Sequence, residues 1–299
     1  MRGPSFIPKL LAHPGAPLFA LVFIAYAYFY QAGGWNQNGR FDMTRAIVEK
    51  GTSSIDAYHR NTGDKARVRG HYYCEKAPAT SWLAVPAHAA WCALAGRPTS
   101  RAAIDRAAYV STVFAVSLPA ALAVLALVWL LGALGCPPLT RFIGAAGYGL
   151  ATLAWPHATL FYGQQLSAAL SLGGFALVVA ARDRTGRGQR LCLGAGGFLL
   201  GASVMADYPA VLCALAVTIY AAVRVRPLAR VAWLVAGGAV PAVLLAAYHT
   251  SVFGGPLHLP YEYSLMPYRH QGFFMGLGVP SGEVLLNILV TPYRGLFFS

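Results

Sequence analysis

The feature that most constrains this chain is a series of long apolar runs separated by short polar segments. A helix needs roughly 20 apolar residues to cross the hydrocarbon of a bilayer. The sequence therefore predicts an all-α, polytopic membrane helix bundle of about eight or nine spans. The expected spans cover residues 16–34, 79–95, 107–134, 142–155, 166–181, 191–206, 209–223 and 231–248, with a ninth beginning near residue 284.

Composition and charge agree with a membrane protein. The chain of 299 residues is 57% hydrophobic and 11% charged, which is not typical of a soluble domain. We expect one transmembrane domain over residues 1–299. The formal charge of +13 comes mostly from arginine clusters between the spans, which is the positive-inside pattern rather than a basic face for nucleic acid. We expect no nucleic-acid partner.

The amino-terminal run favours a multi-pass protein of the inner (cytoplasmic) membrane with a cytoplasmic N-terminus. Arg2 and Lys9 precede the first run, and no small-residue cleavage site follows it, so we expect an uncleaved span. Simple alternation then places residues 97–106 inside but the four-arginine cluster at 182–190 outside. Either a segment between residues 79 and 155 dips without crossing, or the Arg97 loop is external. With the four-arginine cluster inside, residues 35–76, 207–209 and 250–282 share the outer face.

The first external loop, residues 35–78, concentrates charge. It holds three of the four lysines and five of the ten carboxylates: Asp42, Glu49, Asp56, Asp64 and Glu75. This crowding indicates a site, although an extramembrane loop is also where charge is simply solvated. The loop is expected to carry short interfacial helices, and residues 53–73 are expected to be ordered by packing on the spans.

Two stretches of this loop carry specific signals. Asp42 stands where a helix N-cap would, Gly51 stands where a helix would stop, and Arg45 can pair with Glu49 one turn on. Capping this helix would by itself account for Asp42, without a role in a functional site. Near the loop's end, Glu75 and Lys76 precede Pro78, which suits the first turn of the next helix.

The position of Lys76 calls for an anionic partner. The helix dipole favours a carboxylate such as Glu75 near the helix N-terminus, but an ammonium there gains nothing from it. A lipid headgroup or an anionic substrate would supply the missing partner.

The stretches "RFDMTR" and "YYCEKAP" resemble motifs of the membrane-embedded GT-C glycosyltransferases that use polyprenyl-phosphate sugars. The resemblance implies catalytic roles for Asp42 and Glu75 and a phosphate-binding role for Lys76. Ala77 departs from the family, where many members have proline after the lysine. Such relatives usually continue with further spans, so we expect this chain to be either a fragment or a shortened member that would be inactive if truncated. Further candidate substrate-binding residues in the loop are Arg40, Arg45, Lys65 and Tyr73.

This resemblance fits a physical scheme. A lipid-linked sugar places its phosphate at the interface, where Lys76 would hold it, while Asp42 would act as general base on an acceptor in a lipid or glycan. Glu75 would orient Lys76, bind a divalent ion or position the acceptor. The competing function is a transporter or flippase for a lipid-linked or anionic solute, but the sequence shows no repeated halves. A non-catalytic scaffold is a third class.

Other polar groups carry weaker signals. The cysteines and histidines lack metal-ligand spacing, so we expect no structural metal, and the cysteines are interpreted as small core residues. Asp207 interrupts an apolar stretch and is either functional or solvated in a surface turn. Residues 250–282 are aromatic and proline-rich, and they would form a second external loop over a lipid-linked donor or an interfacial linker.

Overall fold

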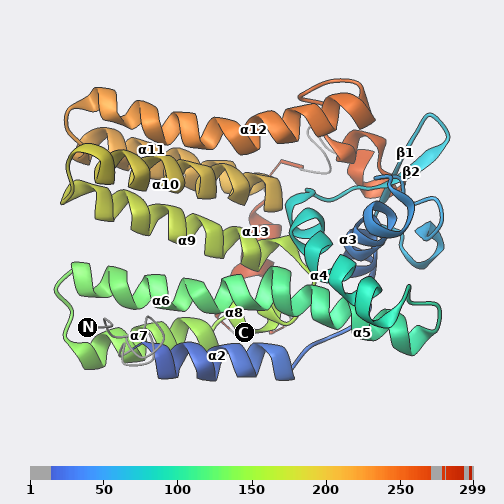
Figure 1. The fold of residues 1–299 in the computed structure, drawn as a ribbon, viewed down its shortest axis with the longest axis horizontal. Coiled ribbons are helices and arrows are strands. Elements are labelled where there is room, and N and C mark those ends of the chain that lie inside the picture. Colours follow the sequence, from blue (N-terminus) through green and yellow to red (C-terminus); the bar gives the residue numbers. More distant parts are fainter. Residues whose placement is uncertain (1–14, 271–277, 280, 293–295, 298–299) are drawn as a thin grey trace, which may run out of the picture.

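The computed structural model describes residues 15–270, 278–279, 281–292 and 296–297. These residues are mostly helical, and the long helices lie side by side in one elongated bundle (Figure 1). Within the described residues, four helical stretches are long and apolar enough to cross a membrane: Arg101–Ala133, Gly163–Arg182, Gly186–Ala206 and Leu228–Phe253. Two shorter apolar helices cover Ala16–Tyr28 and Tyr208–Arg224. The predicted helical membrane bundle is confirmed in this form, but eight or nine spans are not.

The bundle has two halves in Figure 1. The lower half contains α2 (Ala16–Tyr28), a 33-residue helix made of α5 (Arg101–Thr112), a π-helical turn and α6 (Leu118–Ala133), then α7 (Pro138–Leu150) and the short α8 (Ala154–Ala158). The upper half contains α9 (Gly163–Arg182), α10 (Gly186–Ala206), α11 (Val211–Arg224) and α12 (Ala232–Phe253). Helix α13 (Gly282–Val290) coincides with the predicted ninth span, but it has nine residues and none of them is buried.

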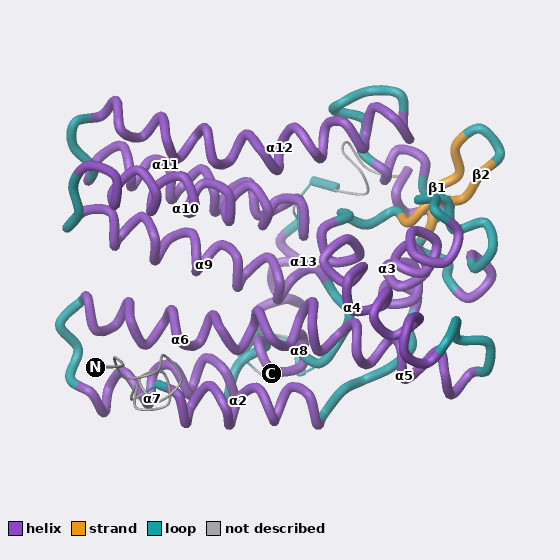
Figure 2. The backbone as a smooth tube through the Cα atoms, in the orientation of Figure 1, coloured by secondary structure: helices purple, strands orange, loops and turns teal. Residues whose placement is uncertain are grey.

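Two ends of the bundle differ in charge. The α6–α7, α9–α10 and α11–α12 connections all lie at the left end in Figure 2. We call this the arginine end, because these connections and the adjoining helix turns carry Arg141, Arg182, Arg184, Arg187, Arg190, Arg224, Arg226 and Arg230, with Asp183 as the accompanying carboxylate. The basic residues 1–14 lie outside the described part of the chain. The opposite end, which we call the loop end, carries the first loop (Figure 1).

Helix α4 (Ala79–Ala95) explains why simple alternation failed. It has the predicted bounds, but it follows the first loop, precedes α5 and lies with both at the loop end (Figures 1 and 2). The loop containing Arg97 therefore lies at the loop end, away from the other arginine clusters. Both alternatives agree with this arrangement: α4 stays at the loop end, and the Arg97 loop lies at the end where an external loop was expected.

The first loop contains a helix and a β-hairpin. Helix α3 (Trp35–Arg45) continues as a π-helical segment, Ala46–Lys50, and stops at Gly51 in the left-handed region (φ 67°), as predicted. Strands β1 (Lys65–Val68) and β2 (His71–Cys74) pair antiparallel across a two-residue turn at Arg69 and Gly70, both with positive φ. The all-α prediction is therefore wrong at this hairpin.

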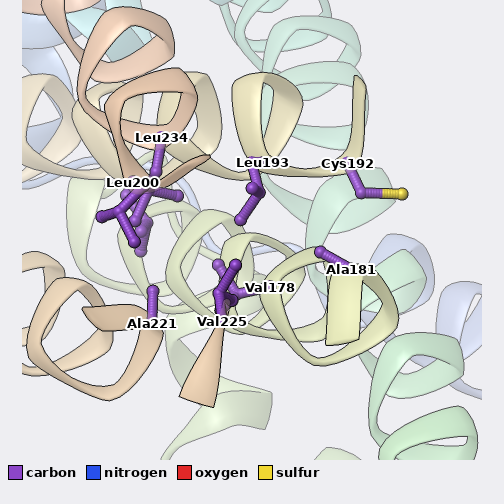
Figure 3. Packing of buried hydrophobic residues seen from close by; sticks show 9 residues of the cluster. Val178, Ala181, Cys192, Leu193, Leu200, Ala221, Val225 and Leu234 are labelled. Atoms are coloured by element: carbon purple, nitrogen blue, oxygen red, sulfur yellow. The ribbon is translucent and has the colours of Figure 1, made fainter. Parts of the chain in front are cut away.

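Close packing holds the upper half of the bundle together. Apolar side chains from α9, α10, α11 and α12 meet in one cluster (Figure 3). A Cβ atom at Gly197 would overlap the carbonyl oxygen of Leu234, so α10 and α12 touch through their backbones. Small residues thus allow the close approach of helices, as expected.

A second cluster attaches the first loop to α12. Met43, Ile55 and Ala66 are buried against Tyr248 and Val252 near the C-terminal end of that helix. The expected packing of the loop on the bundle is therefore confirmed.

Candidate functional site

The adjacent residues Glu75 and Lys76 form the buried centre of the loop end. The Lys76 Nζ atom lies 2.7 Å from Glu75 Oε1 and 3.1 Å from Asp64 Oδ2. Glu75 is 0% exposed and Lys76 is 6% exposed, so both charges are removed from water. Burial lowers the pKa of the Lys76 ammonium, but Glu75 and Asp64 outweigh that effect and raise the pKa overall. Lys76 is therefore a stable cation with two carboxylate partners.

The second loop closes over this pair. Ser264 Oγ donates a hydrogen bond to Glu75 Oε2, and Arg269 Nη2 lies 3.7 Å from Glu75 Oε1. Tyr261 lies beneath both cations, with its ring centroid 4.1 Å from Arg269 Cζ and 5.8 Å from Lys76 Nζ. The expected second external loop thus contacts the first over the described residues 259–270; positions 271–277 and 280 lie outside the described part.

Arg40 brings a third cation to the same place from α3. It is buried, and its Nε and Nη1 donate to Asn36 Oδ1 and the Ala77 carbonyl oxygen, each at 2.9 Å. Among the described residues, no carboxylate oxygen lies within 4.0 Å of its guanidinium nitrogens. A Cβ at Gly163 would lie 2.9 Å from Arg40 Nη2 and would overlap the carbonyl oxygen of Ala206. Glycine at the start of α9 therefore lets Arg40 reach the end of α10.

Tyr261 and Asp207 both lie close enough to these cations for their pKa values to be affected. The pKa of the Tyr261 phenol is raised by burial, against the lowering effect of Lys76, Arg269 and Arg40. The pKa of Asp207 is likewise raised by burial, while Arg40 and Lys76 oppose the shift. We call Arg40, Lys76 and Arg269 the cation centre. Asp207, whose role the sequence left open, lies beside the cation centre.

Asp42 lies apart from the cation centre. Helix α3 begins at Trp35, so the predicted N-cap is wrong and Asp42 is inside the helix. Residues two apart on a helix point about 200° apart, so Asp42 and Arg40 face opposite sides of α3. Asp42 Oδ1 accepts a hydrogen bond from Asn61 Nδ2 at 3.2 Å, while Oδ2 is buried and has no partner among the described residues.

The environment of Asp42 suits a proton acceptor. Burial raises its pKa to about 7, against the lowering effects of Asn61, Arg45 and Lys65. A carboxyl group that titrates near neutrality has a suitable pKa for a general base. A cavity of about 220 Å³ adjoins its neighbours Asn61 and Arg45 and is also lined by α5 residues.

Arg45 belongs to a different buried network. The predicted pair with Glu49 is confirmed, with Arg45 Nε 2.9 Å from Glu49 Oε1. Tyr58 donates to Glu49 Oε2 at 2.9 Å, and His88 Nε2 lies 2.9 Å from Oε1. Cys92 Sγ lies 3.6 Å from His88 Nε2. Arg45 thus neutralises a buried carboxylate rather than joining the cation centre.

This network also contains side chains that can bind a metal ion. One ligand atom from each of Glu49, His88 and Cys92 lies within 4.8 Å of the others. Both Glu49 oxygens already accept hydrogen bonds from Arg45, so the donor set does not fit a metal ion well. This group was not predicted because Glu49 is far from α4 in the sequence; its local signal is the four-residue spacing of His88 and Cys92.

Two predicted substrate-binding residues have other contacts. Lys65 Nζ donates to the His59 carbonyl oxygen at 2.7 Å and lies over the Tyr72 ring. The Tyr73 ring meets Phe253 edge-on, with centroids 6.1 Å apart. Neither side chain makes a hydrogen bond or ion pair with the cation centre in the described structure.

Comparisons with known proteins do not identify a family. No protein-family model matches the chain, and no curated protein or solved structure matches it. The resemblance of the two loop motifs to GT-C glycosyltransferases therefore stays a prediction, and function must be inferred from the site itself.

Proposed function

We propose that the chain is a membrane-embedded glycosyltransferase that moves a sugar from a polyprenyl-phosphate donor to a lipid or glycan acceptor. The observation that supports this most is the cation centre, which gathers Arg40, Lys76 and Arg269 at the end of an apolar helix bundle. A polyprenyl phosphate needs cations at the interface and hydrocarbon for its tail. The arginine end would be cytoplasmic by the positive-inside rule, so transfer would occur on the outer face of the inner membrane.

The contacts refine which cations bind the donor phosphate. Lys76 already has two carboxylate partners, whereas Arg40 has none within 4.0 Å and the buried Nε of Arg269 has no hydrogen-bond partner among the described residues. A guanidinium can bind a phosphate through two parallel hydrogen bonds. We therefore assign the phosphate contacts to Arg40 and Arg269. Lys76 adds positive potential.

Glu75 fits the first of its three predicted roles, which is to orient Lys76. Its Oε1 accepts from Lys76, and its Oε2 accepts from Ser264. Because both oxygens are already engaged by donors, the residues present do not fit a divalent ion at Glu75. No step of the proposed reaction uses one.

The transfer step requires a base near the cation centre. The acceptor oxygen attacks the anomeric carbon, the bond from that carbon to the phosphate oxygen breaks, and the polyprenyl phosphate leaves with the electron pair. The acceptor proton passes to a carboxylate. Asp42 was the predicted base. Asp207, however, lies beside the cation centre, near Arg40, and its pKa is also raised. We assign the base to Asp207, with Asp42 as the alternative.

A transfer assay tests this proposal. Purified protein in vesicles would be incubated with radiolabelled polyprenyl-phosphate sugars and a membrane acceptor fraction, and loss of label from the polyprenyl lipid would be measured. We expect transfer by the unmodified chain, loss of transfer in Asp207→Asn with donor binding retained, and retained transfer in Asp42→Asn. The reverse result for the two variants would return the base role to Asp42. Label that crosses the bilayer still attached to its lipid would instead identify a flippase.

A further inference from the structure

A groove at the arginine end has the features of a lipid-binding site. It has a volume of about 680 Å³, within the usual range for ligand sites, and lies between α10 and α12. Its α10 wall consists of Arg187, Arg190, Leu191, Gly194, Ala195 and Phe198, which recur at helical spacing and so share one face. Trp233, Ala236, Gly237 and Val240 of α12 form the other wall.

Backbone contact between the two helices creates this groove. A Cβ at Gly237 would overlap the carbonyl oxygen of Gly194, so the floor is main chain. Larger side chains, such as Phe198 and Trp233, rise on either side and remain about half exposed. From Trp233 to Val240 the apolar wall extends along α12 by about 10 Å, at roughly 1.5 Å per residue. The groove therefore runs from the bundle end toward its middle.

Two arginines at the mouth of the groove lack an anionic partner. Arg187 and Arg190 make no hydrogen bond or ion pair within the described part of the chain. The Arg190 guanidinium lies 5.7 Å from the centroid of the Trp233 ring, which places it over the groove's α12 wall. Both arginines are exposed, so an external anion can reach them.

We propose that this groove binds an anionic phospholipid, with the phosphate between Arg187 and Arg190 and an acyl chain along the apolar walls. Charge complementarity favours this occupant, because basic pockets between membrane helices on the cytoplasmic side bind anionic headgroups. The site is separate from the cation centre at the loop end. It does not depend on the proposed glycosyltransferase activity.

The test measures lipid binding to the purified full chain by native mass spectrometry in detergent, with phosphatidylglycerol and phosphatidylcholine as probes. We expect phosphatidylglycerol to bind more tightly, and Arg187→Gln with Arg190→Gln to weaken it by roughly 30-fold, or about 1 kcal/mol per arginine. The matched control is Arg224→Gln with Arg226→Gln, which removes the same charge from the same end but outside the groove. This control should keep the preference for phosphatidylglycerol.

A second variant tests the apolar part of the groove. Ala195→Leu with Ala236→Leu fills it without changing charge and should also weaken phosphatidylglycerol binding. Three results would each overturn the proposal. The first is equal binding of both lipids, and the second is an equal loss of phosphatidylglycerol binding in the groove variant and the control arginine variant. The third is unchanged phosphatidylglycerol binding when the two leucines fill the groove. A dimer that dissociates on filling would show that a second copy covers this face, and would overturn it as well. Inorganic phosphate that displaces phosphatidylglycerol completely at equal concentration would exclude a role for the acyl chain.

Discussion

Ser264 donates a hydrogen bond to Glu75 across 189 positions of the sequence, and this contact joins the two loops at one end of the bundle. A neighbouring main-chain bond reinforces it, since the Leu265 amide donates to the Lys65 carbonyl oxygen at 3.1 Å. The second loop thereby brings Arg269 and Tyr261 to Lys76. The candidate site consequently depends on both loops.

Replacement of Ser264 by alanine should destabilise the protein. The change removes a buried donor from the Glu75 carboxylate, and a hydrogen bond to a carboxylate contributes about 1.5 to 3 kcal/mol. The free energy of unfolding in mild detergent should fall by this amount. Ser251→Ala is the control, because the Ser251 hydroxyl donates within its own helix to the Tyr248 carbonyl oxygen. Equal stability of the two variants would show that the contact between the loops is unimportant.

Lys76→Met should be more disruptive than loss of a single ion pair. The change removes the cation that pairs with Asp64. Glu75 then keeps Ser264 and the more distant Arg269 as its partners. Removing one partner of a buried pair costs about 3 to 5 kcal/mol of unfolding free energy. Adding Glu75→Gln should restore only part of this, because Asp64 is still unpaired.

The control for Lys76 is Lys50→Met, which alters an exposed lysine. Urea titrations of the single variants and the double variant measure these differences. Complete rescue in the double variant would mean that Asp64 contributes nothing to holding Lys76.

Asp42→Asn should change how stability depends on pH. The folded-state pKa of Asp42 is about 7, above its ordinary value, so the folded protein binds this proton more tightly than the unfolded chain. The contribution of Asp42 to wild-type stability should therefore fall as pH rises from about 4 to about 7 and level off above that. In this variant the Asn61 side chain can still donate to the amide oxygen at position 42. Relative to wild type, Asp42→Asn should gain stability as the pH rises from about 4 to about 7. A difference in unfolding free energy that is constant over this range would contradict the buried neutral carboxyl.

Cysteine labelling should show the two ends of the bundle on opposite sides of the membrane. Ala57 lies exposed in the first loop, and Thr185 lies exposed in the α9–α10 connection. In a Cys213→Ala background, which removes the exposed native cysteine, an impermeant maleimide should label Ala57→Cys in intact cells. Thr185→Cys should react only after lysis. The opposite pattern would reverse the proposed orientation and place the cation centre in the cytoplasm.

Sequence reasoning succeeded where the determinants are local. The apolar runs located most helices, and the spacing of Arg45 and Glu49 predicted their ion pair. It failed at Asp42 because α3 begins seven residues earlier, after Gly33 and Gly34 with positive φ, which mark the true boundary. The hairpin was not predicted because its two-residue turn, Arg69–Gly70, lacks the Asn-Gly or Asp-Gly pair that is the strongest hairpin signal.

The rest of the site depends on long-range contacts that no local pattern reveals. Glu75 and Lys76 were identified because they are adjacent in the sequence. The positions of Ser264 and Arg269 beside Glu75 follow from the packing of the two loops. The importance of Arg40 is also tertiary. Its position depends on the close approach allowed by Gly163, at the start of another helix.

The affinity of the purified chain for a polyprenyl-phosphate sugar tests the central claim most directly. Arg269→Gln keeps a polar side chain but removes a charge-assisted phosphate contact worth about 1.5 to 3 kcal/mol, so the dissociation constant should rise by roughly one to two orders of magnitude. Arg67→Gln, at an exposed hairpin position, and the double variant Arg187→Gln with Arg190→Gln, at the arginine end, should bind the donor as the wild type does. Unchanged donor affinity in a folded Arg269→Gln variant, together with unchanged affinity in Arg40→Gln, would contradict the account.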